Sequence, residues 1–150
     1  MKGLFSKILI PVDGSRYSLN AVRLGGRMAL FHGAEVFLLH VVDSEVLEQL
    51  CRADKGRCAE IEAEMEAEAR GLLEDMGREL TGLGIADAES LLKKGVPYDV
   101  ILDVADELGI DLIVMGKLGR RGIKRILLGS VAERVIEFSR CPVLLSDGQG

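Results

Sequence analysis

Aromatic residues are scarce in this sequence, and tryptophan is absent. They make up only 4% of the 150 residues, although the hydrophobic share reaches 48%. We therefore expect an aliphatic core, of the size that a single domain spanning residues 1–150 builds. No apolar run approaches the roughly 18 residues that a membrane-spanning helix needs. The sequence accordingly predicts no membrane partner.

Cysteine is also rare, with residues only at positions 51, 58 and 141. Cys51 and Cys58 are seven residues apart, which is not the Cys-x-x-Cys spacing of metal sites. The stretch Met1–Phe5 lacks the apolar core of a secretory signal. These features predict free thiols in a reducing cytoplasm. The net charge of −5 argues against general nucleic-acid binding.

Apolar runs and helical patterns alternate along the chain. Predicted strands cover residues 7–12, 35–42, 85–93, 111–115 and 141–146, and the third is the least aliphatic, so an edge position is expected for it. Predicted helices cover about residues 15–31, 55–80 and 97–108, with a fourth that begins near residue 130. Residues 43–54 are expected to form a connection. This alternation predicts an α/β fold with a mainly parallel sheet and helices on both faces.

The most distinctive segment is Gly116–Ser130, which joins a predicted strand to a predicted helix. Its glycines at positions 116, 119 and 129 allow the backbone to approach a ligand closely. The helix start adds unpaired N–H groups and a positive dipole end. Ser130 falls where an N-cap is expected, so its hydroxyl would cap the helix or contact an anion. The segment predicts a phosphate-binding loop; the alternative is that the glycines only turn the chain.

The same segment is basic and contains no acidic residue. On a chain of net negative charge, such a cluster favours a local anion over a polyanionic partner, although solvated cations remain an alternative. The cations are Lys117, Arg120, Arg121, Lys124 and Arg125.

A second polar signal, Asp13-Gly14-Ser15, follows the first predicted strand. In open α/β sheets, ligands bind beyond the carboxyl ends of the strands where the strand order reverses. If one ligand contacts this signal and the glycine-rich segment, the first and fourth strands are neighbours. The predicted strand order is then 3-2-1-4-5, in a three-layer sandwich.

Asp13 offers a carboxylate at that crevice, which could accept bonds from ribose hydroxyls or bind Mg²⁺. The alternative for Asp13 is an N-cap or Asx-turn into the first helix. Val41, at the end of the second strand, could line an adenine slot or be ordinary core. His40 beside it is expected to have a backbone partner and no catalytic role.

Several nucleotide-dependent classes lack their signatures here. The sequence contains no G-x-x-x-x-G-K-[ST], no G-x-G-x-x-G after the first strand and no G-x-S-x-G. It also offers no evident general base or water-positioning residue, so efficient hydrolysis is not expected.

Three stretches of the sequence resemble the universal stress protein family. They are the series Gly116-x2-Gly119-x9-Gly129-Ser130, the opening Ile8–Ser15 and the ending Cys141–Leu145. The similarity spans essentially the whole chain, and the glycine spacing is typical of the ATP-binding members. The resemblance implies a Rossmann-like α/β domain that binds ATP or AMP, with Mg²⁺ or Mn²⁺, usually as a homodimer.

The resemblance also implies a set of binding residues. Those expected around adenine and ribose are Pro11, Val12, Asp13 and Val41. Those expected at the base of the pocket are Met115 and Gly116, and those expected at the phosphates are Gly119, Gly129, Ser130 and Val131, with Arg120 from the basic cluster beside them. Leu118 departs from the family pattern, which often has small polar or basic residues there, so only backbone contacts are expected from it.

The fifth strand is expected at an edge of the sheet, where an aliphatic strand invites pairing. We therefore predict a homodimer through Val143 to Leu145. Three functions remain open: an ATP- or AMP-binding stress or signalling module with slow or no hydrolysis, a slow ATP-hydrolysing or adenylating enzyme in which Asp13 holds Mg²⁺, and a nucleotide-independent interaction module that uses the acidic helix 55–80.

Overall fold

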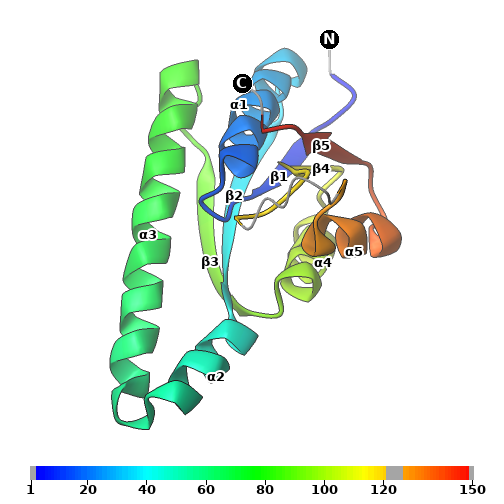
Figure 1. The fold of residues 1–150 in the computed structure, drawn as a ribbon. Coiled ribbons are helices and arrows are strands. Elements are labelled where there is room, and N and C mark those ends of the chain that lie inside the picture. Colours follow the sequence, from blue (N-terminus) through cyan, green and yellow to red (C-terminus); the bar gives the residue numbers. More distant parts are fainter. Residues whose placement is uncertain (1–2, 121–126, 149–150) are drawn as a thin grey trace.

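Five strands and the helices between them form a three-layer sandwich in the computed structural model, which describes residues 3–120 and 127–148 (Figure 1). The elements are β1 (Lys7–Pro11), α1 (Arg16–His32), β2 (Glu35–Asp43), α2 (Ser44–Ala53), η1 (Lys55–Arg57), α3 (Cys58–Leu83), β3 (Glu89–Gly95), α4 (Pro97–Leu108), β4 (Leu112–Gly116), α5 (Ser130–Phe138) and β5 (Val143–Ser146). None of the described helices is long and apolar enough to cross a membrane.

The sheet has the order β3-β2-β1-β4-β5, and its neighbouring strands all run parallel. Ile8 of β1 lies opposite Val36 of β2 on one side and Leu112 of β4 on the other. The chain therefore winds outward through β2 and β3 and then returns to β4. The predicted order 3-2-1-4-5 is confirmed, and the strand order reverses between β1 and β4.

The core lies on both faces of the sheet because successive side chains of a strand point to opposite faces. Ile8 and Ile10 pack on the face that α1 and α3 cover, whereas Leu9 packs on the face that α4 and α5 cover. All three side chains are fully buried. Aliphatic residues thus fill the interior, as the scarcity of aromatic residues predicts.

Two consecutive glycines let α1 lie close to its neighbours. A Cβ atom at Gly25 would be 2.6 Å from Cδ1 of Ile10 in the sheet, and one at Gly26 would be 2.9 Å from Cδ2 of Leu80 in α3. Glycine inside a helix costs about 1 kcal/mol relative to alanine. The close approach explains why the sequence accepts that cost twice.

The segment predicted as a connection is in fact the ten-residue helix α2. Asp43 caps it, because Oδ1 of Asp43 accepts hydrogen bonds from Glu45 N and Val46 N at 3.0 and 3.4 Å. Leu47 is the one residue of α2 that is buried. The apolar residues Val46, Leu47 and Leu50 have helical spacing, but the helix is only ten residues long, and together with the capping aspartate they were the cue that the sequence offered.

The prediction of three free thiols is wrong for two of them. Cys51 at the end of α2 and Cys58 at the start of α3 form a disulfide, and Cys141 is free. The spacing alone did not show this pairing, because it depends on the chain reversal at Asp54 and η1. The thiol argument for a cytoplasmic location therefore loses its support.

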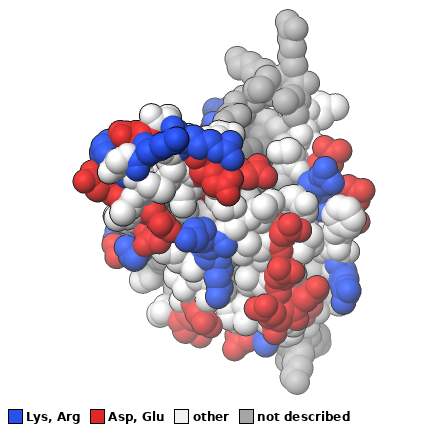
Figure 2. Space-filling model, turned by 90° about the horizontal axis from the view of Figure 1, so that it is seen from below, with Lys and Arg blue, Asp and Glu red and all other residues white. Residues whose placement is uncertain are grey.

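The acidic helix α3 lies along the edge of the molecule, and with α2 it projects past the sheet at the end where β2 finishes (Figure 1). Its charged face is dense in ion pairs. Arg57 contacts Glu60 and Glu64 at 3.0 and 3.1 Å, and Lys94 of β3 pairs with Glu62. Figure 2 shows basic and acidic side chains interspersed over the face of the molecule seen from below.

Candidate functional site

The predicted site residues come together at the carboxyl ends of β1, β2 and β4. Val12 N donates a hydrogen bond to Leu39 O of β2 at 2.8 Å, which keeps the end of β1 beside β2. Lys117 N donates to Ser146 O at 2.8 Å, which keeps the end of β4 beside β5. The loops after β1 and β4 consequently leave the sheet side by side, as the shared-pocket argument requires.

Buried residues form the floor of this edge. Pro11, Val12 and Met115 are buried, and Val41 at the end of β2 is half-buried against the cluster that contains Met115. His40 directly precedes Val41 in the sequence, and its Nδ1 is 2.7 Å from Val12 O. The prediction of a backbone partner for His40 is therefore confirmed, and the side chain of Val41 is the one at this floor that is open to a ligand.

The structure shows one of the two roles that the sequence left open for the carboxylate of Asp13, the Asx-turn, and leaves the other as a prediction. Its Oδ1 accepts a hydrogen bond from Ser15 N at 2.9 Å, which forms the Asx-turn into α1. Ser15 is the N-cap of α1, with Oγ accepting from Ser18 N at 3.1 Å. The second oxygen, Oδ2, is 3.1 Å from the point that a Cβ at Gly119 would occupy. One oxygen thus holds the turn while the other faces the glycine-rich loop.

The glycine-rich loop closes upon itself. Gly129 N donates a hydrogen bond to Lys117 O at 2.9 Å, and a Cβ at Gly129 would be 3.4 Å from Leu118 Cα. On the other side, a Cβ at Gly116 would be 2.7 Å from Cβ of Tyr17 in α1. The loop therefore needs glycine at position 116, where α1 passes too close for a Cβ, whereas a Cβ at position 129 would lie at ordinary contact distance from the backbone.

The start of α5 differs by one residue from the prediction. The N-cap is Gly129, with φ −70° and ψ 155°, and its carbonyl accepts from Glu133 N at 2.9 Å. Ser130 is the first helical residue, so its predicted role as N-cap is wrong. Gly129 has no side chain to cap this helix. Within residues 3–120 and 127–148, no hydrogen bond is seen to the N–H groups of Ser130 and Val131, which could therefore bind an anion or water.

Arg120 is a described cation of the loop that lies close to Gly14, the neighbour of Asp13. Its Nε is 3.7 Å from the point that a Cβ at Gly14 would occupy, and its Nη2 is 3.6 Å from Oε1 of Glu68 on α3. Both side chains of this ion pair are about two-thirds exposed, at 66% and 71%. Such pairs contribute about 0–1 kcal/mol, so Arg120 can exchange Glu68 for a stronger anion. The predicted cations at positions 121, 124 and 125 lie outside the described residues.

Sequence reasoning did not identify Tyr17 or Glu68 as neighbours of the site. Tyr17 supports Gly116 and also lies where a Cβ at Gly148 would be 2.6 Å from its ring. Glu68 reaches the loop because α3 passes the carboxyl edge of the sheet (Figure 1). Both contacts are tertiary, and nothing in the spacing of the sequence marks either residue.

Among the described residues, no group of three or more His, Cys, Asp or Glu side chains is arranged to hold a metal ion. Asp13 supplies a carboxylate oxygen that faces Gly119 of the loop, and the other carboxylate described at the loop, Glu68, pairs with Arg120. A Mg²⁺ or Mn²⁺ ion at Asp13 would take its other ligands from phosphate oxygens and water, which fits the preference of Mg²⁺ for few protein ligands.

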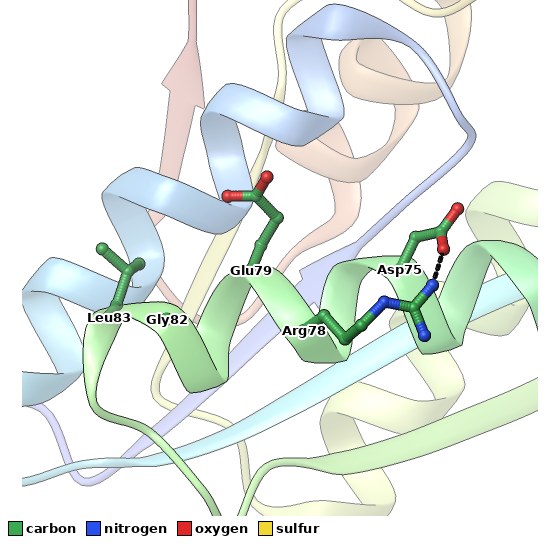
Figure 3. A pocket seen from close by; sticks show the side chains of 5 residues that line it. All are labelled: Asp75, Arg78, Glu79, Gly82 and Leu83. Atoms are coloured by element: carbon green, nitrogen blue, oxygen red, sulfur yellow. Dashed lines mark hydrogen bonds and ion pairs between the residues drawn. The ribbon is translucent and has the colours of Figure 1, made fainter.

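A separate surface hollow lies on α3, away from the strand ends (Figure 3). Its lining residues come from the last turns of that one helix, where Asp75 and Arg78 point toward each other and form an ion pair. Glu79 points away from them and pairs with Arg23 of α1 at 3.3 Å. None of the predicted site residues lines this hollow, and its charges neutralise one another.

The sequence and the fold of this chain are similar to those of known proteins. The family model described as "Universal stress protein family" matches residues 4–146. The universal stress protein MJ0531 of Methanocaldococcus jannaschii is 38% identical over 144 residues, which covers 96% of this chain and 83% of that protein. The structure of MJ0577 from the same organism has a TM-score of 0.84 and 31% identity, with 96% of each chain covered.

Two further structures carry a nucleotide in their descriptions. A universal stress protein in complex with cAMP has a TM-score of 0.72 and 26% identity, and covers 97% of this chain and 98% of its own. The universal stress protein from Archaeoglobus fulgidus in complex with dAMP has a TM-score of 0.65 and 25% identity, and covers 95% of this chain and 98% of its own.

Proposed function

Because the chain belongs to the universal stress protein family, we propose that it is a stress-response or signalling module that holds an adenine nucleotide, ATP or AMP, at the carboxyl ends of β1 and β4. The observation that carries this proposal is the convergence of three features at one edge: a carboxylate oxygen of Asp13, a closed glycine-rich loop and a helix without a side-chain cap. The complexes of relatives with cAMP and dAMP support an adenine ligand.

The two ends of the nucleotide have different partners in this arrangement. Adenine lies over the half-buried Val41 and the backbone of Pro11 and Val12, and Asp13 accepts from ribose hydroxyls. The phosphates meet the N–H groups at the start of α5 and the backbone of Gly119 and Gly129. Anions at a helix N-terminus are stabilised both by unpaired donors and by the helix dipole. Arg120 leaves Glu68 to contact a phosphate oxygen.

Hydrolysis is slow or absent in this proposal. The described residues around the loop supply phosphate contacts, and two carboxylates lie near it. In this proposal Asp13 is occupied by ribose or by the metal ion, and Glu68 lies on α3 beside Arg120. The runner-up function is a slow ATP-hydrolysing or adenylating enzyme, with Asp13 holding Mg²⁺. Product analysis with labelled ATP separates the two, because intact ATP in stoichiometric amount supports the binding module.

Isothermal titration with ATP and AMP, with and without Mg²⁺, tests the proposal. We expect saturable heat with a stoichiometry of one nucleotide per chain and a matching rise in melting temperature. If neither nucleotide gives heat or a thermal shift, the nucleotide-independent interaction module is the better function. Mass spectrometry of small molecules released from the purified protein would identify the nucleotide that is bound in cells.

We also propose a homodimer through β5. Among the described strands, β5 is at one edge of the sheet, and Val143 to Leu145 are only half-buried. The end of α5 beside it exposes Phe138 at 53%. Light scattering at micromolar concentration should give the mass of two chains. Phe138→Glu should shift that mass toward one chain, whereas Phe31→Glu, at an exposed phenylalanine in the last turn of α1, should leave it unchanged.

A further inference from the structure

The disulfide between Cys51 and Cys58 lies outside the core, at the tip of the hairpin formed by α2 and α3. Neither cysteine is among the buried core residues, and both are partly exposed. The sulfurs lie beside a shallow surface hollow that is also lined by Glu48, Arg52 and Lys55. A thiol reagent can therefore reach the bond from solvent while the sheet and its two apolar clusters stay intact.

Cys58 lies at a helix start with charged groups of both signs nearby. It is the first residue of α3, a helix of 26 residues whose N-cap residue makes no side-chain capping bond. Arg52 and Lys55 line the hollow, and Glu48 also lines it and pairs with Arg52 at 3.8 Å. The positive end of a helix dipole favours negative charge, so Cys58 is the better placed of the two sulfurs to leave in thiol–disulfide exchange.

We propose that Cys51 and Cys58 form a thiol–disulfide exchange site whose co-reactant is a dithiol, and that its redox state sets how firmly α2 is held beside the nucleotide site. One thiolate of the dithiol attacks Sγ of Cys51. The disulfide bond breaks, and its electron pair leaves with Cys58 as thiolate. The second thiol then attacks the mixed disulfide and releases Cys51. The dithiol leaves as a disulfide, and its two protons and two electrons pass to the two cysteines.

The position of the hairpin connects this site to the strand ends. Asp43, the N-cap of α2, is the last residue of β2 and follows closely after Val41. At the other side of the disulfide, α3 carries Glu68, which pairs with Arg120 of the glycine-rich loop. The oxidised hairpin thus spans from the adenine side to the phosphate side of the proposed site, and this step of the inference rests on the proposed function.

Reduction removes the disulfide, which leaves the short backbone connection through η1 as the covalent link between α2 and α3. Without the disulfide, α2 is held by its cap and by the burial of Leu47. A helix with so few buried contacts belongs to the low-stability end of a structure and opens more readily than the core. We therefore expect the reduced protein to keep its sheet, to expose α2 more often and to bind nucleotide more weakly.

The first experiment is a redox titration of the folded chain in mixtures of reduced and oxidised dithiothreitol, with the thiols trapped by alkylation and mapped by mass spectrometry. The pair should titrate reversibly in one two-electron step while the far-UV circular dichroism stays native. Transient mixed disulfide with a monothiol, reduced glutathione, should map to Cys51. A bond that yields only when the fold unfolds, or that does not form again in oxidised dithiothreitol, would overturn the proposal.

The second experiment compares oxidised protein, reduced protein and the double variant C51S/C58S. Hydrogen exchange of residues 44–57 should accelerate by at least about tenfold in both reduced forms. The dissociation constant for ATP should rise by roughly three- to tenfold, because the binding-competent arrangement is less populated. The matched control is Cys141→Ser, which removes the free thiol that lies beside Ser139. It should change neither measurement.

The outcomes keep the two proposals apart. If oxidised and reduced proteins bind ATP equally, the link between the hairpin and the nucleotide site is wrong, although the proposed function stands. If the oxidised protein binds neither ATP nor AMP, the proposed function fails. The redox titration still tests whether the two cysteines exchange with a dithiol, and the hydrogen exchange still tests whether the disulfide stabilises α2. Should the double variant misfold, chemical reduction of the native chain supplies the same comparison.

Discussion

At the amino edge of the sheet, Asp111 lies just before β4, and both of its oxygens accept hydrogen bonds from the chain itself. Oδ2 accepts from Ser6 N and Ser6 Oγ, and Oδ1 accepts from Lys7 N, each at 2.9 Å. Lys7 Nζ in turn donates to Leu108 O at 3.0 Å. This network joins the starts of β1 and β4, and it satisfies its polar groups internally.

At the carboxyl edge of the same two strands, Asp13 uses only one oxygen for the chain. Oδ1 holds the Asx-turn through Ser15 N, and Oδ2 faces Gly119. The helix that starts nearby, α5, lacks a side-chain cap. The polar groups that the amino edge satisfies internally are thus left available at the carboxyl edge. One edge joins the two strands, and the other is the edge at which we propose that a ligand binds.

Among the variants that test this difference between the two edges, Gly129→Val should cause the largest loss of nucleotide affinity. The two added methyl groups would enter the space beside Leu118 Cα and Lys117 O, where even a Cβ would lie at 3.4 Å. We expect nucleotide affinity to fall by about 100-fold or more, which corresponds to about 2.8 kcal/mol. Isothermal titration measures this loss, and urea unfolding should show a native fold.

Gly129→Ala is the matched control for that variant. Its single methyl group lies at ordinary contact distance, and the backbone at φ −70° and ψ 155° suits any residue. Its loss of affinity should be several-fold smaller. Unchanged binding by Gly129→Val would show that the phosphates do not lie on this loop.

Asp13→Asn should weaken binding by about tenfold while changing stability little. The amide keeps an oxygen for the hydrogen bond from Ser15 N, but it loses the charge that a metal ion or ribose hydroxyl would use, and a charged hydrogen bond contributes about 1.5–3 kcal/mol. Titrations with and without Mg²⁺ should show that the wild-type advantage depends on the metal ion. Equal Mg²⁺ dependence in both proteins would remove Asp13 as a metal ligand.

Asp111→Asn should reduce stability and leave nucleotide binding unchanged, the opposite of Asp13→Asn. An asparagine cannot accept all three hydrogen bonds with both side-chain atoms, so we expect a loss of about 1–2 kcal/mol in the free energy of unfolding. Nucleotide affinity should be unchanged. Urea unfolding and titration of this variant and of Asp13→Asn form a crossed pair. A variant that loses both properties would show that the two edges are not independent.

Most of the fold could be predicted because four of the five strands are short aliphatic runs and the long helices carry apolar residues in steps of three and four. The least aliphatic strand, β3, was expected at an edge and lies there. The order of the strands required one further assumption, that the loops after β1 and β4 share a ligand. The apolar residues Val46, Leu47 and Leu50 of α2 have helical spacing, but so short a pattern does not by itself distinguish a helix from a connection.

The candidate site was predictable where it depends on backbone, and not where it depends on tertiary contact. The glycines at positions 116 and 129 mark close approaches that the structure contains. The contact of Glu68 depends on how α3 lies against the distant loop, and the Cys51–Cys58 bond depends on the chain reversal between α2 and α3. The cap of α5 differed by one residue because helix boundaries are set by dihedral angles that Gly129 and Ser130 could each adopt.

Gly119→Ala should have a smaller effect, on binding alone. Its Cβ would lie 3.1 Å from Oδ2 of Asp13, so the carboxylate must move by a few tenths of an ångström. We expect roughly a threefold loss of affinity, or about 0.6 kcal/mol, and no loss of stability. Titration of Gly119→Ala in the Asp13→Asn background tests the contact, because the two effects should not add if they share one cause.

The smallest expected effect concerns the acid response of the amino edge. Burial alone would raise the pKa of Asp111, but hydrogen bonds from Ser6 N, Lys7 N and Ser6 Oγ outweigh it and hold the pKa below the ordinary value of 3.8. A carboxyl whose pKa is lower in the folded state stabilises the fold above the unfolded pKa, and this contribution is lost as pH falls through the folded pKa. The difference in unfolding free energy between wild type and Asp111→Asn should therefore be constant above about pH 5 and shrink below pH 3.8. Urea unfolding of both proteins across this range measures it. A difference that grows in acid would mean that Asp111 binds its proton more tightly in the folded state, which would make burial the dominant influence at this edge.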